Sequence, residues 1–318
     1  MPQSKFELER RMLLTAAAFA GFESIGGDSP AQAQSVPAMP RPYLVDRAFV
    51  RLAEGPVHYR WGGTIKKGGP VPLYMAHAGP GSSQSFAPWI RELSADRFVF
   101  APDMLGNGDS APPARDETDI AYYVDCAVRI MDALKIPKVD FYGTHTGALI
   151  GCELAATHPD RVRKLVVDGT PIFPPDFRKQ LYENYAPKMQ PDAYGGHLAW
   201  AWRFVRDMSQ FWPYFEQNAA HRLPNDVPTP DNLHPRVVDV LRALTTYHIA
   251  YRAAFSHDTA KVLPRIKVPT MLTGSERDSL SVYLDEAAAL VPGSRKMLFA
   301  RGTALTDQIG AVAKFLAV

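Results

Sequence analysis

Cysteine is nearly absent from this chain of 318 residues, which contains only Cys126 and Cys152. Both lie in runs with helical patterning, and no Cys–His spacing typical of a zinc site accompanies them. We therefore expect two buried thiols that act as small apolar side chains. A single disulfide between them stays open if the chain reaches an oxidising compartment. No metal and no cofactor are expected.

An excess of charge of either sign is also missing. The 35 Lys and Arg residues nearly balance the 33 Asp and Glu residues, for a formal net charge of +2. The basic residues are scattered and do not form the clustered patch that nucleic-acid-binding proteins use. The composition favours a small molecule over nucleic acid as the partner, and a homodimer stays open.

Hydrophobic runs long enough to span a membrane do not occur. The run 12–22 is too short for this, and it follows the pair Arg10-Arg11. Small residues around Ala33 resemble a signal-peptide cleavage site. We predict that residues 1–33 are a twin-arginine export signal, so that the mature protein is periplasmic or secreted and not membrane-bound. The alternative is an amphipathic or disordered tail.

After this segment the chain has a Pro- and Ala-rich linker and then the pattern of an α/β protein. The linker is assigned to 34–47, and alternation around Gly55-Pro56 predicts a hairpin within 48–61. Strands are predicted at 72–78, 98–102, 139–143, 165–168, 270–273 and 296–300. Helical stretches separate most of them, including 86–93, 120–134 and 149–157. This alternation predicts a mostly parallel central sheet with helices on both faces, which binds ligands at the carboxyl ends of its strands.

The alternation stops between residues 173 and 258, a segment rich in aromatic side chains. We interpret this segment as a helical cap inserted into a core formed by 48–172 and 259–318. A cap over the strand ends would act as a lid and form an apolar pocket. Most of its aromatic residues are expected to pack the cap against the core.

The most informative stretch is Gly143-Thr144-His145-Thr146-Gly147. It lies between a strand-like run and a helix-like run, where the nucleophile elbow Gly-x-Ser-x-Gly is expected. The central residue here is histidine. The frame of an enzyme is therefore present without its usual nucleophile.

From residue 48 to the C-terminus, four further motifs appear in a fixed order. They are an oxyanion loop at 77–82, an Asp-x-x-Gly-x-Gly-x-Ser turn at 103–110, a His-Pro-Asp-Arg-Val segment at 158–162 and an acid loop at 274–278. Together with the elbow they resemble the α/β-hydrolase fold superfamily. The resemblance implies that fold, a hydrolase activity and a catalytic acid at Asp278.

Two positions depart from the pattern of this superfamily. His145 replaces the elbow serine, and Thr303 stands where the catalytic histidine of the last loop is expected. No histidine follows His257. A serine–histidine–acid mechanism therefore cannot operate, and loss of the nucleophile or base costs such enzymes about six orders of magnitude in turnover.

We hypothesise that His145 and Asp278 form a dyad. Histidine tolerates the positive φ of an elbow better than most residues, and its ring is long enough to reach the acid loop. Asp278 would orient one ring nitrogen, while the other would act as a general base with a pKa of about 6.5. Such a base could activate water, or it could remove a proton from carbon or oxygen.

Further residues are assigned to the same site. Backbone N–H groups of the segment Ala78-Gly79 and of Thr146 are candidate oxyanion donors. Thr144, Thr146 and Thr303 offer hydroxyl groups, and Thr303 as a nucleophile is a minor alternative.

Other polar residues are given supporting roles. His77 and Asp103 are expected to hold their loops in shape, and His248 and Tyr251 to line the pocket. Asp168 and Glu276 are expected to support the site or to face solvent.

Three functions remain compatible with these residues. The first is hydrolysis of a small apolar ester- or lactone-like substrate by water that His145 activates. The second is cofactor-independent lyase or isomerase chemistry by the same base. The third is a non-catalytic protein that binds a ligand in the same pocket. Preserved elbow glycines and Asp278 beside an introduced base favour catalysis.

Overall fold

The computed structural model describes residues 44–317, which form one compact unit. The predicted export signal and nearly all of the linker lie outside the described residues. The first strand begins at Asp46, two residues before the predicted start of the core at residue 48. Among the described helices, none combines the length and the apolar character needed to cross a bilayer.

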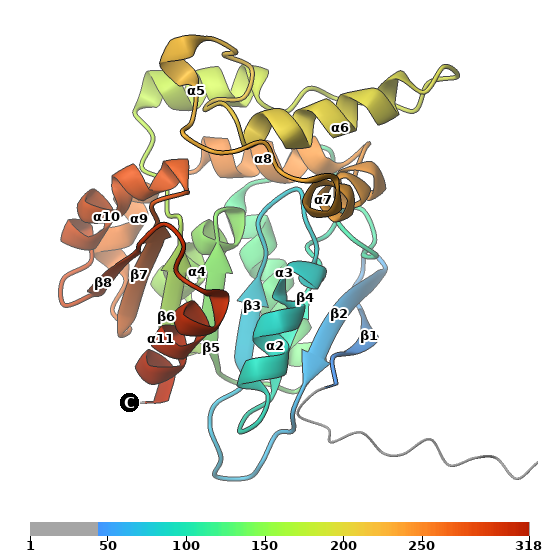
Figure 1. Ribbon diagram of the computed structural model, residues 1–318. Coiled ribbons are helices and arrows are strands. Elements are labelled where there is room, and N and C mark those ends of the chain that lie inside the picture. The colour runs from blue at the N-terminus through green and yellow to red at the C-terminus, as the bar shows by residue number, and fades with distance from the viewer. Residues whose placement is uncertain (1–43, 318) are drawn as a thin grey trace, which may run out of the picture. The chain divides into compact units, whose positions relative to one another are not determined.

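An eight-stranded sheet in the order β1-β2-β4-β3-β5-β6-β7-β8 is the centre of the molecule (Figure 1). The strands are β1 (Asp46–Arg51), β2 (Pro56–Gly62), β3 (Leu73–Ala76), β4 (Val99–Pro102), β5 (Val139–Thr144), β6 (Val162–Asp168), β7 (Thr270–Ser275) and β8 (Arg295–Phe299). β1 and β2 form the predicted hairpin, and β2 pairs with β4 in antiparallel fashion. All other pairs are parallel, which confirms the predicted sheet.

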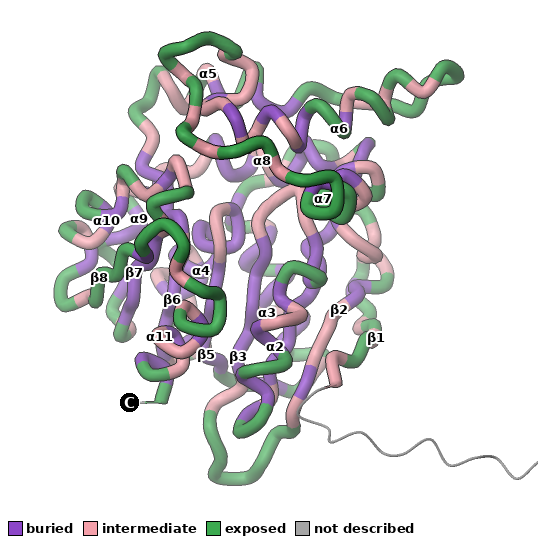
Figure 2. The backbone as a smooth tube through the Cα atoms, in the orientation of Figure 1, coloured by how far each residue is buried: buried purple, intermediate pink, exposed green. Residues whose placement is uncertain are grey.

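Side chains on the central strands alternate between two apolar cores because successive residues of a strand point to opposite faces. On β3, Tyr74 packs in one core with Phe141, and their rings stack with centroids 5.0 Å apart. Leu73 and Met75 pack in the core on the other face. Strands buried on both faces are typical of parallel sheets, and the central strands are buried in Figure 2.

Helices cover both faces of the sheet. The first core lies under α3 (Ile120–Ala133), α4 (Thr146–Thr157) and α10 (Leu284–Leu290), and the second under α2 (Ala87–Leu93) and α11 (Leu305–Ala317). Cys126 on α3 and Cys152 on α4 are buried in the first core as free thiols. They therefore act as small apolar side chains in this structure, and the disulfide left open by the sequence is not formed.

The inserted segment forms four helices above the carboxyl ends of the parallel strands (Figure 1). They are α5 (Pro175–Asn184), α6 (Gly196–Met208), α7 (Pro230–Arg242) and α8 (Tyr247–Ser256), followed by the short α9 (Thr259–Val262). The cap has its own core, in which Phe204, Val237 and Tyr247 are buried. Ala250 and Ala253 of α8 belong to the first core of the sheet and hold the cap over the strand ends, where ligands bind in such sheets.

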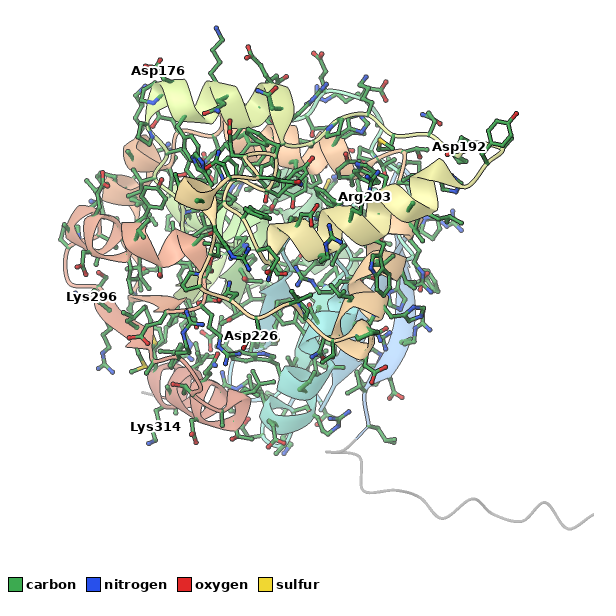
Figure 3. All side chains as sticks on the ribbon, turned by 45° about the horizontal axis from the view of Figure 1, so that its top comes forward. Asp176, Asp192, Arg203, Asp226, Lys296 and Lys314 are labelled. Atoms are coloured by element: carbon green, nitrogen blue, oxygen red, sulfur yellow. The ribbon has the colours of Figure 1, made fainter. Side chains whose placement is uncertain are left out.

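One carboxylate, Asp140 on β5, is fully buried at the base of the sheet. It accepts hydrogen bonds from Arg97 Nη1 at 3.0 Å and from Arg163 Nε at 2.8 Å. By contrast, charged residues such as Lys296 and Asp226 lie on the exterior (Figure 3). Buried charges are retained in proteins only when they are paired in this way.

Replacement of Asp140 by Ala should therefore destabilise the fold strongly, because two guanidinium groups would lose their carboxylate. We expect the free energy of unfolding to fall by about 3–5 kcal/mol, measured by denaturant unfolding. Asp132→Ala is the matched control, since Asp132 is 60% exposed and pairs with Arg161 at 2.7 Å. Its loss should cost less than about 1 kcal/mol. Equal losses in the two variants would contradict the assignment of a structural role to Asp140.

Candidate active site

The sharp bend between β5 and α4 places His145 at the carboxyl edge of the sheet. His145 has φ 48° and ψ −110°, and only Lys135 shares a positive φ among the described non-glycine residues. Its backbone N–H donates to the carbonyl of Asp168 at 2.9 Å. A Cβ at Gly147 would lie 2.1 Å from the carbonyl oxygen of Ala76, so this glycine lets α4 start close against β3. The bend directs the His145 side chain above the sheet.

The ring of His145 reaches the acid loop, as the dyad hypothesis requires. Its Nε2 lies 2.7 Å from Oδ2 of Asp278, and Oδ1 of Asp278 accepts a hydrogen bond from the Leu280 N–H at 2.9 Å. Both carboxylate oxygens are thus engaged. An ionised carboxylate only accepts hydrogen bonds, so Nε2 carries a proton, and in the neutral form of the ring Nδ1 keeps its lone pair. The catalytic role of the pair stays a prediction.

Electrostatic effects favour the charged form of both partners. Burial acts to lower the pKa of His145, but the nearby Asp278 carboxylate outweighs burial, and the pKa of the imidazole is raised. For Asp278, burial acts to raise the pKa. The charge and the hydrogen bond of His145 outweigh burial, so the pKa of Asp278 is lowered. The pair therefore resembles an ion pair, and neutral His145 becomes populated only above its raised pKa.

Gly169 creates the space in which the two side chains meet, and the sequence interpretation missed it. It follows β6 with φ +64°. A Cβ there would lie 2.4 Å from His145 Cδ2 and 2.7 Å from Asp278 Oδ2. A glycine directly after a strand that neighbours the elbow is the one signal in the sequence that could have identified it.

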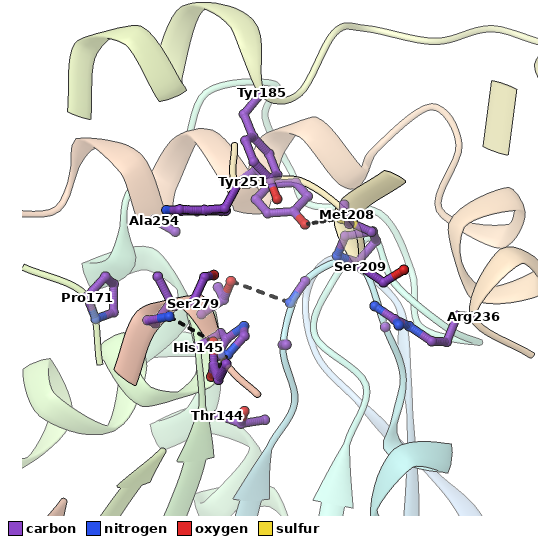
Figure 4. A pocket seen from close by; sticks show the side chains of 18 of the residues that line it. Thr144, His145, Pro171, Tyr185, Met208, Ser209, Arg236, Tyr251, Ala254 and Ser279 are labelled. Carbon is purple, nitrogen blue, oxygen red and sulfur yellow. Dashed lines mark hydrogen bonds and ion pairs between the residues drawn. The ribbon is translucent and has the colours of Figure 1, made fainter. Parts of the chain in front are cut away.

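A cavity of about 540 Å³ lies between the elbow, the acid loop and the cap (Figure 4). Five of the predicted site residues line it beside the dyad: Ala78, Gly79, Thr144, Thr146 and Tyr251. Aromatic cap residues form much of its wall, namely Phe173, Tyr185, Trp212 and Phe255. The His145 side chain is 41% exposed and faces this cavity. It is therefore not enclosed among core side chains.

Potential oxyanion donors lie beside the ring. Thr146 is the first residue of α4, so its N–H has no acceptor within the helix and lies at the positive end of the helix dipole. The Gly79 N–H lies 3.4 Å from Thr146 Oγ1. These groups bring partial positive charge to the floor of the cavity.

His77 and Asp103 make contacts that hold loops together. His77 Nδ1 lies 2.8 Å from the carbonyl of Ala78, and Nε2 accepts from the Met104 N–H at 2.9 Å. Asp103 accepts from the Ser83 N–H at 2.6 Å. Burial acts to raise the pKa of Asp103, but its hydrogen bonds, first that from His58, lower it to about 2. Both residues are buried.

One cluster has donor atoms close enough to hold a metal ion. His58, Asp103 and Asp109 bring one ligand atom each within 4.8 Å of one another. Arg47 already occupies this place, because its Nε donates to His58 Nε2 at 3.0 Å and its Nη2 pairs with Asp109. A guanidinium ion supplies the positive charge that a metal would bring, so the cluster is structural.

Two predicted pocket residues are placed elsewhere. Thr303 Oγ1 donates to the carbonyl of Ala300 at 2.8 Å and does not line the cavity, since the last loop turns back on itself. His248 is 4% exposed, and the charges nearest to it belong to Arg252, Lys188 and Asp116 instead of the dyad. The prediction that these two residues line the pocket was therefore wrong. Helical spacing from Tyr251 did not determine the direction of the His248 ring.

Asp168 and Glu276 lie near the dyad without touching its ring nitrogens. Asp168 Oδ1 accepts from Thr273 Oγ1 at 2.8 Å, and burial raises its pKa. Glu276 accepts from the Arg301 N–H at 2.8 Å on the surface. Both therefore have supporting contacts.

Comparison with known proteins agrees with the fold. The profile described as the alpha/beta hydrolase fold matches residues 71–302. A 2-hydroxymuconate semialdehyde hydrolase from Pseudomonas sp. is 43% identical over 107 residues, 32% of this chain and 38% of that protein. A haloalkane dehalogenase from Mycolicibacterium paratuberculosis is 38% identical over 114 residues, 35% of this chain and 36% of that protein. The chain thus spans little more than a third of the length of these relatives.

Solved structures share the fold at low sequence identity. The enol-lactonase from Burkholderia xenovorans has a TM-score of 0.65 and 20% identity, with 85% of this chain and 100% of that chain covered. An epoxide hydrolase from an endophytic Streptomyces has a TM-score of 0.67 and 16% identity, with 86% and 95% covered. At such identities the likeness concerns the fold alone.

The Gly169→Ala variant should separate His145 from Asp278, because its methyl group would occupy their meeting point. We expect the pKa of His145, measured by NMR titration, to fall as the carboxylate moves away. Gly293→Ala is the matched control: Gly293 also has a positive φ of +76°, but a Cβ there meets nothing within 4 Å. Both variants should lose about 1 kcal/mol of stability from backbone strain. An unchanged His145 pKa in folded Gly169→Ala would contradict this role.

Proposed function

The chain belongs to the α/β-hydrolase fold family, and from this premise we propose that it is a hydrolase in which His145 activates water directly. Asp278 orients the imidazole, and no serine nucleophile takes part. The substrate is a small, largely apolar ester- or lactone-like molecule. The first residues of the chain, 1–33, act as a twin-arginine signal that exports the protein to the periplasm or beyond.

The observation that supports this proposal most directly is the position of the ring. Nε2 of His145 is held by Asp278 at 2.7 Å, and the ring lines an open cavity. Among the described residues, Nδ1 has no hydrogen-bond partner, so it is free to accept a proton from a bound molecule. A base whose other nitrogen is fixed by a carboxylate is the arrangement that general-base catalysis requires.

The reaction follows from the placement of these groups. Water hydrogen-bonded to Nδ1 would transfer a proton to it while the water oxygen attacks the carbonyl carbon. The negative charge that develops on the carbonyl oxygen would be stabilised by the N–H group of Thr146 and by the loop at Ala78 and Gly79. The imidazolium, stabilised by Asp278, would then return the proton to the leaving oxygen as the C–O bond breaks.

The class of substrate is supported by the cavity and by the relatives. The cavity wall is mostly apolar, with aromatic residues of the cap on one side. Proteins similar to this chain are named as hydrolases of a semialdehyde and of haloalkanes, and structures of the same fold include an enol-lactonase. The volume of about 540 Å³ suits a molecule of drug-like size or smaller.

The same base could run lyase or isomerase chemistry, and a pocket without turnover would act in binding only. The three functions differ in their products. A panel of esters, lactones and epoxides distinguishes the first from the other two. Products formed without uptake of water would favour the second, and binding without any product would favour the third.

His145→Ala should abolish turnover of the accepted panel substrate while the protein remains folded. The value of kcat should fall by about 10²- to 10⁴-fold, the contribution typical of a general base. His234→Ala is the control, because His234 is an exposed residue on α7 outside the cavity lining. Unchanged turnover in His145→Ala would refute the enzyme assignment. Strong esterase activity in His145→Ser would show that the catalytic histidine lies elsewhere, since Thr303 supplies no base.

The pH dependence of catalysis should report on His145. Its raised pKa means that kcat/KM should increase with pH through a value above about 6.5, as the neutral base becomes populated. Asp278→Asn removes the charge that raises this pKa, so the increase should move to lower pH and the maximal rate should fall. Glu276→Gln, two residues away on the surface, should leave the profile in place. A profile that stays unchanged in Asp278→Asn would exclude the dyad.

A further inference from the structure

The wall of the cavity contains a guanidinium group without an acidic partner. Arg236 extends from α7 and lines the cavity opposite Pro171 and Ala254 (Figure 4). Among the described residues it forms no salt bridge. Arg242, further along the same helix, pairs with Asp109 at 3.2 Å. Arg236 is therefore an exposed cation at the wall of the cavity, and no acidic side chain of the described residues neutralises it.

The acidic side chains of the cavity are engaged elsewhere. Asp278 binds His145 and the Leu280 N–H. Asp239 lies one helical turn after Arg236, but its carboxyl interacts with Ser82, and burial raises its pKa. The protein thus leaves the guanidinium of Arg236 available for an anion from outside.

We propose that Arg236 binds a carboxylate of the substrate, so that the enzyme acts on organic acids that carry a separate hydrolysable ester or lactone bond. A planar guanidinium binds a carboxylate through two parallel hydrogen bonds, and this gives orientation as well as affinity. The apolar part of the acid would lie against Tyr185 and Tyr251. This inference rests on the proposed function, because it names the substrate class of the same site.

Arg236 is close enough to the dyad to influence it. Its positive charge acts on His145 and lowers the pKa of that ring, against the larger effect of Asp278. The charge of Arg236 also acts to lower the pKa of Tyr185 and of Tyr251, which line the cavity. A bound carboxylate would neutralise Arg236 and remove its effect on His145. The base would then be stronger in the complex with an acid than in the complex with a neutral molecule.

A second arginine, Arg277, also lines the cavity from the acid loop, and like Arg236 it is exposed. The two differ in what their charge reaches: Arg236 acts on His145, Tyr185 and Tyr251, whereas Arg277 is not among the main charges that act on these groups. We therefore assign recognition of the carboxylate to Arg236. The experiment compares the two residues directly.

The test uses a matched pair of phenyl esters with the same chain: monophenyl glutarate, which ends in a carboxylate, and its neutral terminal amide. We expect the wild-type protein to prefer the acid in kcat/KM by about 10- to 100-fold, the range for a charged hydrogen bond. Arg236→Met keeps the alkyl stem and should remove the preference for the acid over the amide. Arg236→Lys should restore part of it. Arg242→Met is the control and should retain the full preference.

Three outcomes would overturn the inference. They are equal kcat/KM for the two esters in the wild-type protein, a full preference in folded Arg236→Met, and a loss of preference in Arg277→Met alone. The pH dependence of kcat adds a readout that a merely structural role would not change. The increase of kcat with pH should occur at higher pH for the acid than for the amide. This difference between the two substrates should vanish in Arg236→Met.

A binding measurement separates this inference from the catalytic proposal. By calorimetry, 5-phenylpentanoate should bind to the wild-type protein and to His145→Ala at least about tenfold more tightly than 5-phenylpentanamide does. Arg236→Met should bind the acid and the amide with equal affinity. This result supports the inference even if no ester is hydrolysed, in which case only the hydrolase proposal fails. Equal affinity of acid and amide for the wild-type protein, or no binding of the acid, overturns the inference whether or not hydrolysis occurs.

Discussion

The hydrogen bond between His145 and Asp278 depends on a strained backbone bend and on a missing side chain. The bend at φ 48° directs the imidazole above the sheet, and α4 holds the bend because Gly147 packs against the backbone of β3. Gly169 then leaves the space in which ring and carboxylate meet. Each element alone is ordinary for its fold. Their combination places a base where this fold usually has a nucleophile, and so it determines which chemistry the cavity can support.

Two charged side chains, Asp278 and Arg236, act on the His145 ring from different sides. Asp278 stabilises the imidazolium on one side, and Arg236 opposes it from the other side of the cavity. Most of the remaining wall is apolar, but Arg236 is exposed and the His145 side chain is 41% exposed, so solvent screens the interaction between them in part. A ligand that neutralises Arg236 would therefore change the strength of the base. In the proposed mechanism, substrate recognition at Arg236 and proton transfer at His145 would be coupled through electrostatics, without any movement of the cap.

Much of the architecture could be predicted from local patterns. The hairpin at β1 and β2 and the parallel strands that follow lie within a few residues of their predicted positions, because alternation and apolar runs are local properties. The contact of His145 with Asp278 could also be predicted, since the elbow and the acid loop are adjacent in this fold. Thr303 and His248 were placed wrongly. Their side-chain directions depend on how a loop folds back and how a helix is rotated, which residue spacing does not specify.

The sequence by itself therefore determined the fold class, the elbow with its histidine and the acid that faces it, because these follow from short motifs in a fixed order. The tertiary structure alone decided the space at Gly169 and the unpaired state of Arg236. An arginine on a cap helix and a glycine after a strand are common in any sequence. Their importance arises from the distances to side chains more than twenty residues away, and those distances exist only once the chain is packed.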